Sequence, residues 1–200
     1  MSTASTTLRE LTGQTDTPAR LSDSALIIVD AQNTYREGVM QLTGVEAALD
    51  QCAALLARAR QLKIPVVHIQ HDAGPGTPYD ISAHIGAIAD KVAPIEGEPI
   101  VIKNYPNSFV GTDLDARLKA AGVTNVVIVG FMTHMCINST ARGAFNLGYA
   151  VTVPAAATAT RPLPAPDGSV VSAENLQSAA LAALADLFAV VVPDPAAIAD

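Results

Sequence analysis

The sequence predicts a three-layer α/β/α sandwich around a mostly parallel six-stranded sheet. Six short runs rich in β-branched residues alternate with segments whose apolar residues recur at helical spacing. The runs are apolar throughout, which is typical of strands buried on both faces of a parallel sheet. Helices on both sides, joined to the strands by right-handed crossovers, complete an α/β domain that is Rossmann-like in outline.

The predicted elements follow in order along the chain. The strands span residues 25–30, 64–70, 99–103, 125–130, 149–154 and 188–193. The helices span residues 44–63, 111–122, 136–148 and 172–186, with a shorter one around 80–90. Residues 1–23 are polar, and we expect them to form an extended N-terminal arm ahead of one domain over 24–200.

Helix signals in the sequence support these boundaries. The first helix has one apolar face, made by Val45, Leu49, Cys52, Leu55, Leu56, Ala59 and Leu62. The second has Thr112 as its expected N-cap with Asp115 three residues later, close to a capping box, and Gly122 at its C-terminus. Ser172 is the expected N-cap of the last helix.

Composition excludes several classes of partner. The chain has 12 basic and 19 acidic residues, no Trp and 4% aromatics, so a nucleic-acid-binding surface is not expected. No apolar run reaches the ~20 residues of a membrane helix. The N-terminus lacks the apolar segment of a secretion signal, and we expect a reducing cytoplasm. A 50% hydrophobic chain favours a homo-oligomer.

Three reactive side chains follow predicted strands. Parallel sheets of this kind bind ligands beyond the carboxyl ends of their strands. Asp30 follows the first strand, Lys103 ends the third, and Cys136 follows the fourth at the expected start of a helix. A helix N-terminus and a nearby lysine would lower the pKa of a thiol, and a carboxylate in reach would take its proton and return it. These residue types suit nucleophilic catalysis.

Structural roles are the alternative for each of these residues. Free cysteines are usually small buried hydrophobes, and Cys52 on the apolar face of the first helix fits that role. Asp30 alone could cap a turn, and Lys103 alone could be a solvated surface residue. The case for a site therefore depends on all three residues meeting at one edge of the sheet.

Three separate motifs resemble the isochorismatase-like cysteine hydrolase family. The first is "ALIIVDAQNTY", where Asp30 and Gln32 match a strand–Asp–x–Gln element. The second is "VIKNYPNSFVGTDLDARLKAAG", with matches at Lys103, Ser108, Phe109, Thr112 and Leu114. The third is "VVIVGFMTHMCINSTARGAFNLGY", with matches at Gly130, Thr133 and Cys136. The resemblance covers roughly residues 24–192.

The resemblance implies a triad and a chemistry. Cys136 would be the nucleophile, Asp30 the general base and acid, and Lys103 the cation that stabilises the thiolate. It also implies a cis peptide between Phe131 and Met132, with the N–H groups of Met132 and Cys136 forming an oxyanion hole. Isochorismatases proper cleave a vinyl ether and lack this cysteine, so Cys136 favours hydrolysis of an amide or related C–N bond through a thioester.

No cofactor or metal is expected. Nicotinamidases of the family bind a metal through an Asp and two histidines near the end of the second strand. Asp72 matches the acid, but Gly74 stands where the first histidine should be. His68 and His71 are three apart on a strand, so their side chains face opposite ways. The first strand is followed by no glycine-rich dinucleotide fingerprint.

A small-molecule substrate is the expected partner. Its predicted contacts are Gln32, Tyr35, Tyr105, Phe109, Thr133 and His134. Two other functions stay open at this point: vinyl ether hydrolysis with Asp30 as the acid, and a non-catalytic binding or assembly module of the same fold. Loss of activity in Cys136→Ala would separate the first hypothesis from the second, and an acyl adduct on Cys136 would exclude the third.

Overall fold

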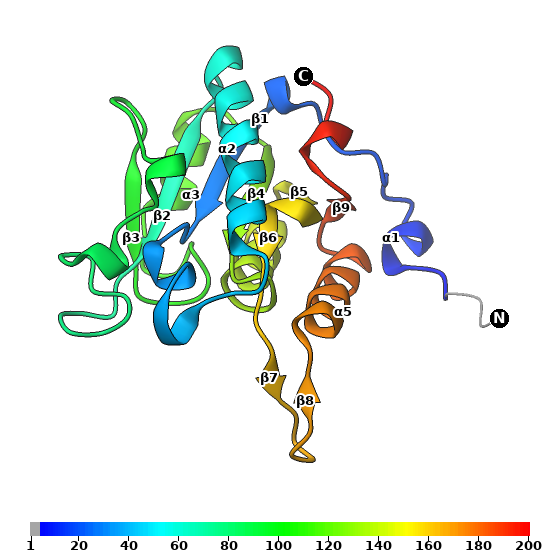
Figure 1. Cartoon of the computed structure of the whole chain (residues 1–200). Coiled ribbons are helices and arrows are strands. Elements are labelled where there is room, and N and C mark those ends of the chain that lie inside the picture. Colours follow the sequence, from blue (N-terminus) through cyan, green and yellow to red (C-terminus); the bar gives the residue numbers. More distant parts are fainter. Residues whose placement is uncertain (1–4) are drawn as a thin grey trace.

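The computed structural model describes residues 5–200 and has the predicted three-layer architecture (Figure 1). Six parallel strands run in the order β3-β2-β1-β4-β5-β9. Their bounds are β1 Ser24–Val29, β2 Val66–His71, β3 Ile100–Lys103, β4 Asn125–Phe131, β5 Ala150–Pro154 and β9 Val190–Val192. A seventh, two-residue strand, β6 (Thr158–Ala159), pairs with the end of β4 and was not predicted.

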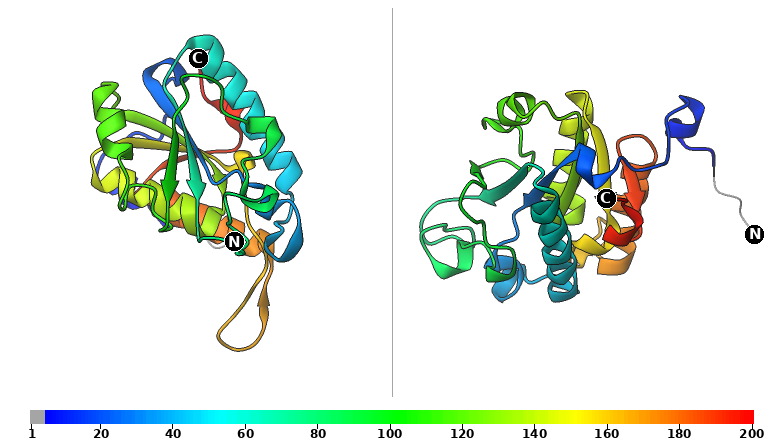
Figure 2. Two further views of the ribbon diagram at one scale, coloured as in Figure 1. Left: turned by 90° about the vertical axis from the view of Figure 1, so that its left-hand side faces the viewer. Right: turned by 90° about the horizontal axis from the view of Figure 1, so that it is seen from above.

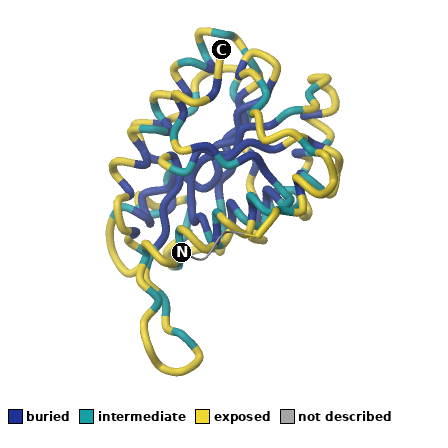
Figure 3. The backbone as a smooth tube through the Cα atoms, turned by 90° about the vertical axis from the view of Figure 1, so that its right-hand side faces the viewer, coloured by how far each residue is buried: buried dark blue, intermediate teal, exposed yellow. Residues whose placement is uncertain are grey.

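The helices cover the two faces of the sheet unequally. One face packs against α2 (Val45–Leu62), and the other packs against α3 (Leu114–Ala120), α4 (Asn138–Asn146) and α5 (Ala173–Ala185). The central strands β1 and β4 are buried on both faces, as their unbroken apolar sequences predict. Edge strand β3 alternates instead: Val101 and Lys103 are buried on one face of the sheet, and Ile100 and Ile102 are exposed on the other. Figure 3 shows the buried sheet between helices whose outer faces are exposed.

Helix α2 confirms the prediction from its apolar spacing. Six of the seven predicted core residues are buried against the sheet, namely Val45, Leu49, Cys52, Leu55, Leu56 and Ala59. Each large aliphatic side chain in that row contributes roughly 1.5–3 kcal/mol by leaving water. Leu62 packs only partly, because it lies in the last turn at the margin of the cluster.

Several helix starts differ from the prediction. Helix α3 begins at Leu114 with Asp113 as N-cap, so the prediction of Thr112 as N-cap is wrong by one residue. The Thr112 hydroxyl donates to the Ser108 carbonyl and also accepts, at 3.4 Å, from the N–H of Leu114. Gly122 follows the C-cap with φ +68°, as expected of a glycine there. Ser172 caps α5 by accepting from the N–H of Asn175, as predicted.

Two loop regions also differ. The expected short helix around 80–90 is instead a pair of 3₁₀ turns, His84–Gly86 and Asp90–Val92. A two-stranded hairpin, β7 (Leu163–Pro164) and β8 (Val170–Val171), was not predicted because its strands are only two residues long. Figures 1 and 2 show that this hairpin projects away from the body of the domain.

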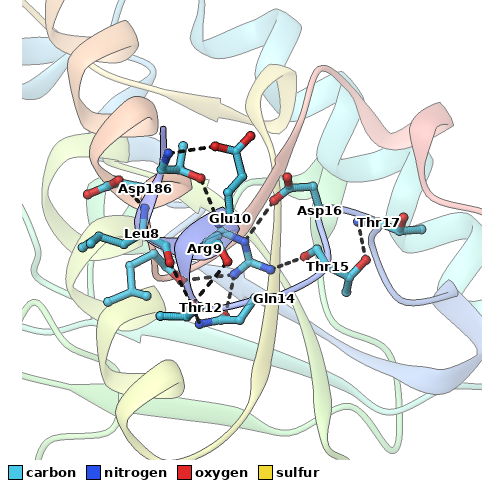
Figure 4. A network of polar contacts seen from close by, with 11 residues as sticks. Leu8, Arg9, Glu10, Thr12, Gln14, Thr15, Asp16, Thr17 and Asp186 are labelled. Atoms are coloured by element: carbon cyan, nitrogen blue, oxygen red, sulfur yellow. Dashed lines mark hydrogen bonds and ion pairs between the residues drawn. The ribbon is translucent and has the colours of Figure 1, made fainter. Parts of the chain in front are cut away.

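The N-terminal arm is not fully extended. Residues 1–4 lie outside the described part of the chain, and Leu8–Leu11 form a single helical turn, α1, held by a Thr7–Glu10 capping box. Buried Arg9 anchors the arm, because its guanidinium donates to the carbonyl oxygens of Leu187 and Thr15 and to side chains of the same arm (Figure 4). These local bonds explain why a polar sequence packs against the domain.

Candidate active site

Asp30 occupies an unusual backbone position directly after β1. Its φ of +49° lies in the left-handed region, which Asp tolerates better than most residues. The residue is fully buried, and its N–H donates to the Ile69 carbonyl of β2. The chain therefore turns sharply out of the sheet at Asp30 and leaves the carboxylate at the edge where the strands end.

Lys103 reaches Asp30 from a strand that is not its neighbour. Strand β2 separates β3 from β1, so the two strand ends lie about 10 Å apart. The long lysine side chain covers most of this distance, and its Nζ lies 2.7 Å from Asp30 Oδ2. Both side chains are fully buried. This short contact between two buried groups of opposite charge is an ion pair.

Cys136 completes the predicted group. Its Sγ lies 3.5 Å from Lys103 Nζ, which also contacts Asp30, so the three side chains meet around one ammonium. The peptide bond between Phe131 and Met132 is cis, as the resemblance implied. Cys136 does not open a regular helix as expected, because it lies within a single π-helical turn, Thr133–Ile137, that precedes α4.

Gly130 allows these elements to approach each other. It has φ +109°, and a Cβ at this position would lie 2.0 Å from the Val29 carbonyl oxygen. Only glycine fits so close to the neighbouring backbone. The ends of β1 and β4 are thereby brought together, which places Asp30 beside the turn that carries Cys136.

The ionisation of the group is governed by burial. Burial, followed by the charge of Asp30, raises the pKa of the Cys136 thiol to about 12, even though Lys103 acts to lower it. The expected lowered thiol pKa is therefore wrong, because desolvation outweighs the lysine. Burial also raises the pKa of Asp30 by more than Lys103 lowers it. A carboxylate of raised pKa is a stronger base, which suits it to accept a thiol proton.

His71 is a member of the group that the sequence did not identify. It ends β2 directly beside Lys103 in the register of the sheet, and its Nδ1 lies 3.1 Å from Lys103 Nζ. Burial, followed by the charge of Lys103, lowers the pKa of its imidazole to about 4. Its position at a strand end was the available signal, but the order of the strands was needed to place it next to Lys103.

A small cavity lies beside the thiol. Its volume is about 210 Å³, and its walls are Tyr35, His71, Tyr79, Pro106, Met132, Met135 and Cys136. Larger hollows elsewhere, such as the one of about 480 Å³ lined by α2 and α5, contain none of the three reactive side chains. The walls of the cavity beside Cys136 are mainly aromatic and apolar and carry no carboxylate, which suits a small uncharged group.

Of the six predicted substrate contacts, Tyr35 is the one in the cavity wall. Tyr105 is 58% exposed, the Phe109 ring stacks on Tyr149, and His134 Nδ1 lies 2.6 Å from the Thr160 hydroxyl. Thr133 is fully buried beneath the turn. A substrate-contacting role for these residues stays a prediction. Tyr79 and Pro106 were missed because they come from loops whose paths the sequence does not reveal, and Met135 because the π-helical turn that carries it was not predicted.

Gln32 has a position that its predicted role as a substrate contact did not anticipate. Its amide oxygen accepts from the N–H of His71, and its amide nitrogen donates to the carbonyl oxygens of His71 and Gly86. The side chain is fully buried, and its amide is engaged by His71 and Gly86 and not by the Asp30 carboxylate. Gln32 thus ties the end of β1 to the end of β2.

Residues 5–200 contain neither a cluster of metal ligands nor a helix suited to cross a membrane. No group of three His, Cys, Asp or Glu side chains there is arranged to hold a metal ion. The Asp72 carboxylate accepts from the N–H of Gly74 within its own turn. None of the helices in this part of the chain has both the length and the apolar character needed to cross a bilayer.

Comparison with known proteins assigns the family. The model of the isochorismatase domain matches residues 24–194, which covers most of the chain. The chain belongs to the isochorismatase family. The crystal structure of an isochorismatase from Pseudomonas putida KT2440 superposes with a TM-score of 0.92 at 36% identity, covering 95% of this chain and 97% of that one.

Two relatives of this isochorismatase-family chain have informative names. The secreted isochorismatase effector Isc1 of Verticillium dahliae is 35% identical over 185 residues, covering 92% of this chain and 95% of that protein. The ureidoacrylate amidohydrolase RutB of Stutzerimonas stutzeri is 30% identical over 166 residues, covering 65% of this chain and 67% of that protein. The chain is thus a hydrolase with an amidohydrolase among its relatives.

Proposed function

We propose that this hydrolase cleaves a small amide or related C–N bond through a thioester on Cys136. One observation carries the proposal: the Lys103 ammonium contacts both the Asp30 carboxylate and the Cys136 sulfur in a buried site beside a cavity. A nucleophile, a base and a cation within contact of one another are the parts that covalent acyl transfer needs.

The first half of the reaction forms the thioester. Asp30 takes the proton of the Cys136 thiol, and the sulfur attacks the amide carbon while Lys103 balances the negative charge. Backbone N–H groups of Met132 and Cys136 hold the oxyanion in this proposal. The C–N bond then breaks, and Asp30 gives the proton to the departing nitrogen.

The second half restores the enzyme. A water molecule loses a proton to Asp30 and attacks the thioester carbonyl. The C–S bond breaks, the carboxylic acid leaves, and the proton returns to the sulfur. The resting thiol, whose pKa is about 12, is neutral at pH 7, so each cycle begins and ends with Cys136 protonated.

The size of the cavity limits the substrate. At about 210 Å³ it lies below the usual range of roughly 300–1,000 Å³ for ligand sites, so the group next to the sulfur must be small. Because Tyr35, Tyr79 and Met135 form much of its wall, we expect an uncharged, partly apolar acyl group. RutB acts on a small substrate by name, which supports the same size class.

A panel of small primary amides and ureido compounds tests the proposal. Intact-mass measurement after rapid acid quench should show an acyl adduct on the wild type and none on Cys136→Ala. If Cys136→Ala keeps its turnover of a vinyl ether substrate while Asp30→Asn loses it, the chemistry is instead that of isochorismatases proper. The absence of turnover and adducts across the panel, with a stable oligomer, would favour the non-catalytic module.

A reducing compartment and a homo-oligomer complete the proposal. The chemistry needs a free thiol at Cys136, which a reducing cytoplasm maintains. Isc1, which is secreted, shows that relatives work elsewhere, so cell fractionation is the measurement that decides. Sedimentation at micromolar concentration tests the oligomeric state. A strict monomer would contradict the proposed homo-oligomer.

A further inference from the structure

The ammonium of Lys103 has three N–H donors and three neighbours. These are Asp30 Oδ2 at 2.7 Å, His71 Nδ1 at 3.1 Å and Cys136 Sγ at 3.5 Å. The lysine is 1% exposed, so water does not readily replace any of them. A buried donor without a partner is costly, which means that each neighbour constrains how the ammonium sits.

The three neighbours differ in charge. Asp30 carries the negative charge that offsets the lysine, and Cys136 is the group that the proposed reaction ionises. His71 is the neutral neighbour, because its imidazole pKa of about 4 leaves it uncharged near pH 7. For Nδ1 to accept from an ammonium, the ring proton must be on Nε2. His71 therefore occupies one N–H of Lys103 without competing for its charge.

His71 is itself held firmly. Gln32 bonds to both its backbone N–H and its carbonyl oxygen, at 2.9 and 3.0 Å. The Tyr79 ring packs edge-on against the imidazole, with 4.9 Å between the centroids. Tyr79 Oη lies 3.4 Å from Tyr35 Oη, so a row of cavity-lining rings supports the imidazole. A side chain anchored in this way can fix its neighbour.

We propose that His71 is a positioning residue, whose Nδ1 accepts one N–H of Lys103 and so directs another N–H at the Cys136 sulfur. Without this acceptor, the lysine would move towards Asp30, its closest partner, and the 3.5 Å contact with sulfur would lengthen. The inference rests on the proposed function, since stabilising sulfur as a thiolate is the task that the directed N–H performs.

Three substitutions at one position test this role. Asn can place its side-chain oxygen where Nδ1 lies, whereas Gln extends its polar end towards the position of Nε2, and Leu has no acceptor. The probe is iodoacetamide, whose alkylation of Cys136 is followed by peptide mass at constant pH. Cys52 is the internal control in every sample, because it is fully buried and far along the chain from the site.

We expect His71→Asn to react at close to the wild-type rate. His71→Gln and His71→Leu should react more slowly by about 10- to 100-fold, the usual cost of displacing a reacting group by roughly 1 Å. Thermal melting identifies any variant that has lost its fold. If His71→Leu is unfolded, the comparison of His71→Asn with His71→Gln still tests the proposal. With an amide substrate, His71→Gln should lower kcat more than it changes KM.

The proposal is overturned if folded His71→Gln alkylates as fast as the wild type, or if His71→Asn is as slow as His71→Gln. Alkylation does not depend on amide turnover, so this result is separate from the test of the proposed function. An active Cys136→Ala would refute the thioester whatever His71 does. A slow His71→Gln beside an inactive Cys136→Ala supports both.

Discussion

The two cysteines of this chain share their burial and differ in their neighbours. Cys52 is fully buried and Cys136 is 5% exposed, and burial raises both thiol pKa values to about 12. Cys52 Sγ donates to the backbone oxygen of Ala157 at 3.3 Å and has no charged neighbour among its hydrogen-bond partners, whereas Cys136 contacts Lys103 and lies beside a cavity. Burial and thiol pKa therefore do not separate a reactive cysteine from a structural one, but charged neighbours and access do.

The largest expected difference between the two cysteines is in catalysis. Cys136→Ala should lower amide turnover by about 10⁴-fold or more, because it removes the nucleophile. Cys52→Ala should leave turnover nearly unchanged. Steady-state kinetics of Cys136→Ala and Cys52→Ala measures this difference. An equal loss of turnover in both variants would mean that the substitutions act through folding and not through the chemical step.

A second prediction concerns a substitution, Lys103→Met, that removes the charged neighbour by which Cys136 differs from Cys52. Lys103→Met leaves the Asp30 carboxylate buried without its cation, which should cost about 3–5 kcal/mol in the free energy of unfolding. Adding Asp30→Asn should recover a large part of that loss, because the uncompensated charge disappears. Urea denaturation of both variants measures the difference; a double variant no more stable than Lys103→Met would contradict the pairing.

A third prediction concerns alkaline pH. The pKa of each thiol is about 12 in the folded state and near 9 in the unfolded state, so its contribution to the free energy of unfolding is complete below pH 9. That stability is lost as the pH rises towards 12, at about 1.4 kcal/mol per pH unit for each thiol. Cys52→Ala should make the fall less steep. Denaturation at several pH values between 8 and 11 checks the slope, and an unchanged slope would rule out Cys52 as a contributor.

The smallest expected effect is that of Cys52→Ala on stability below pH 9. Removing one sulfur from the core under α2 should cost on the order of 1 kcal/mol, the usual size for a single core change. Iodoacetamide should still label Cys136 in this variant at the wild-type rate. A changed rate would show that the two sites are coupled across the sheet.

Much of the fold could be predicted because its signals are local. The runs of β1 and β4 are apolar throughout, and the row of Leu and Ala on α2 has an unmistakable helical spacing. The two-residue strands β6 and β8 escaped prediction because their pairing comes from long-range contact. Thr112 was misplaced as the N-cap because the helix begins one residue later than predicted, although its hydroxyl still accepts weakly from the N–H of Leu114.

The reactive side chains were predictable only in part. Asp30, Lys103 and Cys136 could be proposed from strand ends and shared motifs. Their ionisation could not, because desolvation depends on atoms contributed by the whole fold. His71 was hidden for a related reason: its role follows from β2 lying between β1 and β3, and strand order is not written in local sequence.

The close contact at Gly130 has a consequence for anyone redesigning this enzyme. A methyl group at that position would collide with the backbone of the adjacent strand. A combinatorial library should therefore keep Gly130 unchanged. Pro106, which lines the cavity from a loop, is a better starting point for new specificities than Tyr79, which packs against His71, or Met135, which lies in the turn that carries Cys136. The scaffold thus separates what must stay constant from what selection can explore.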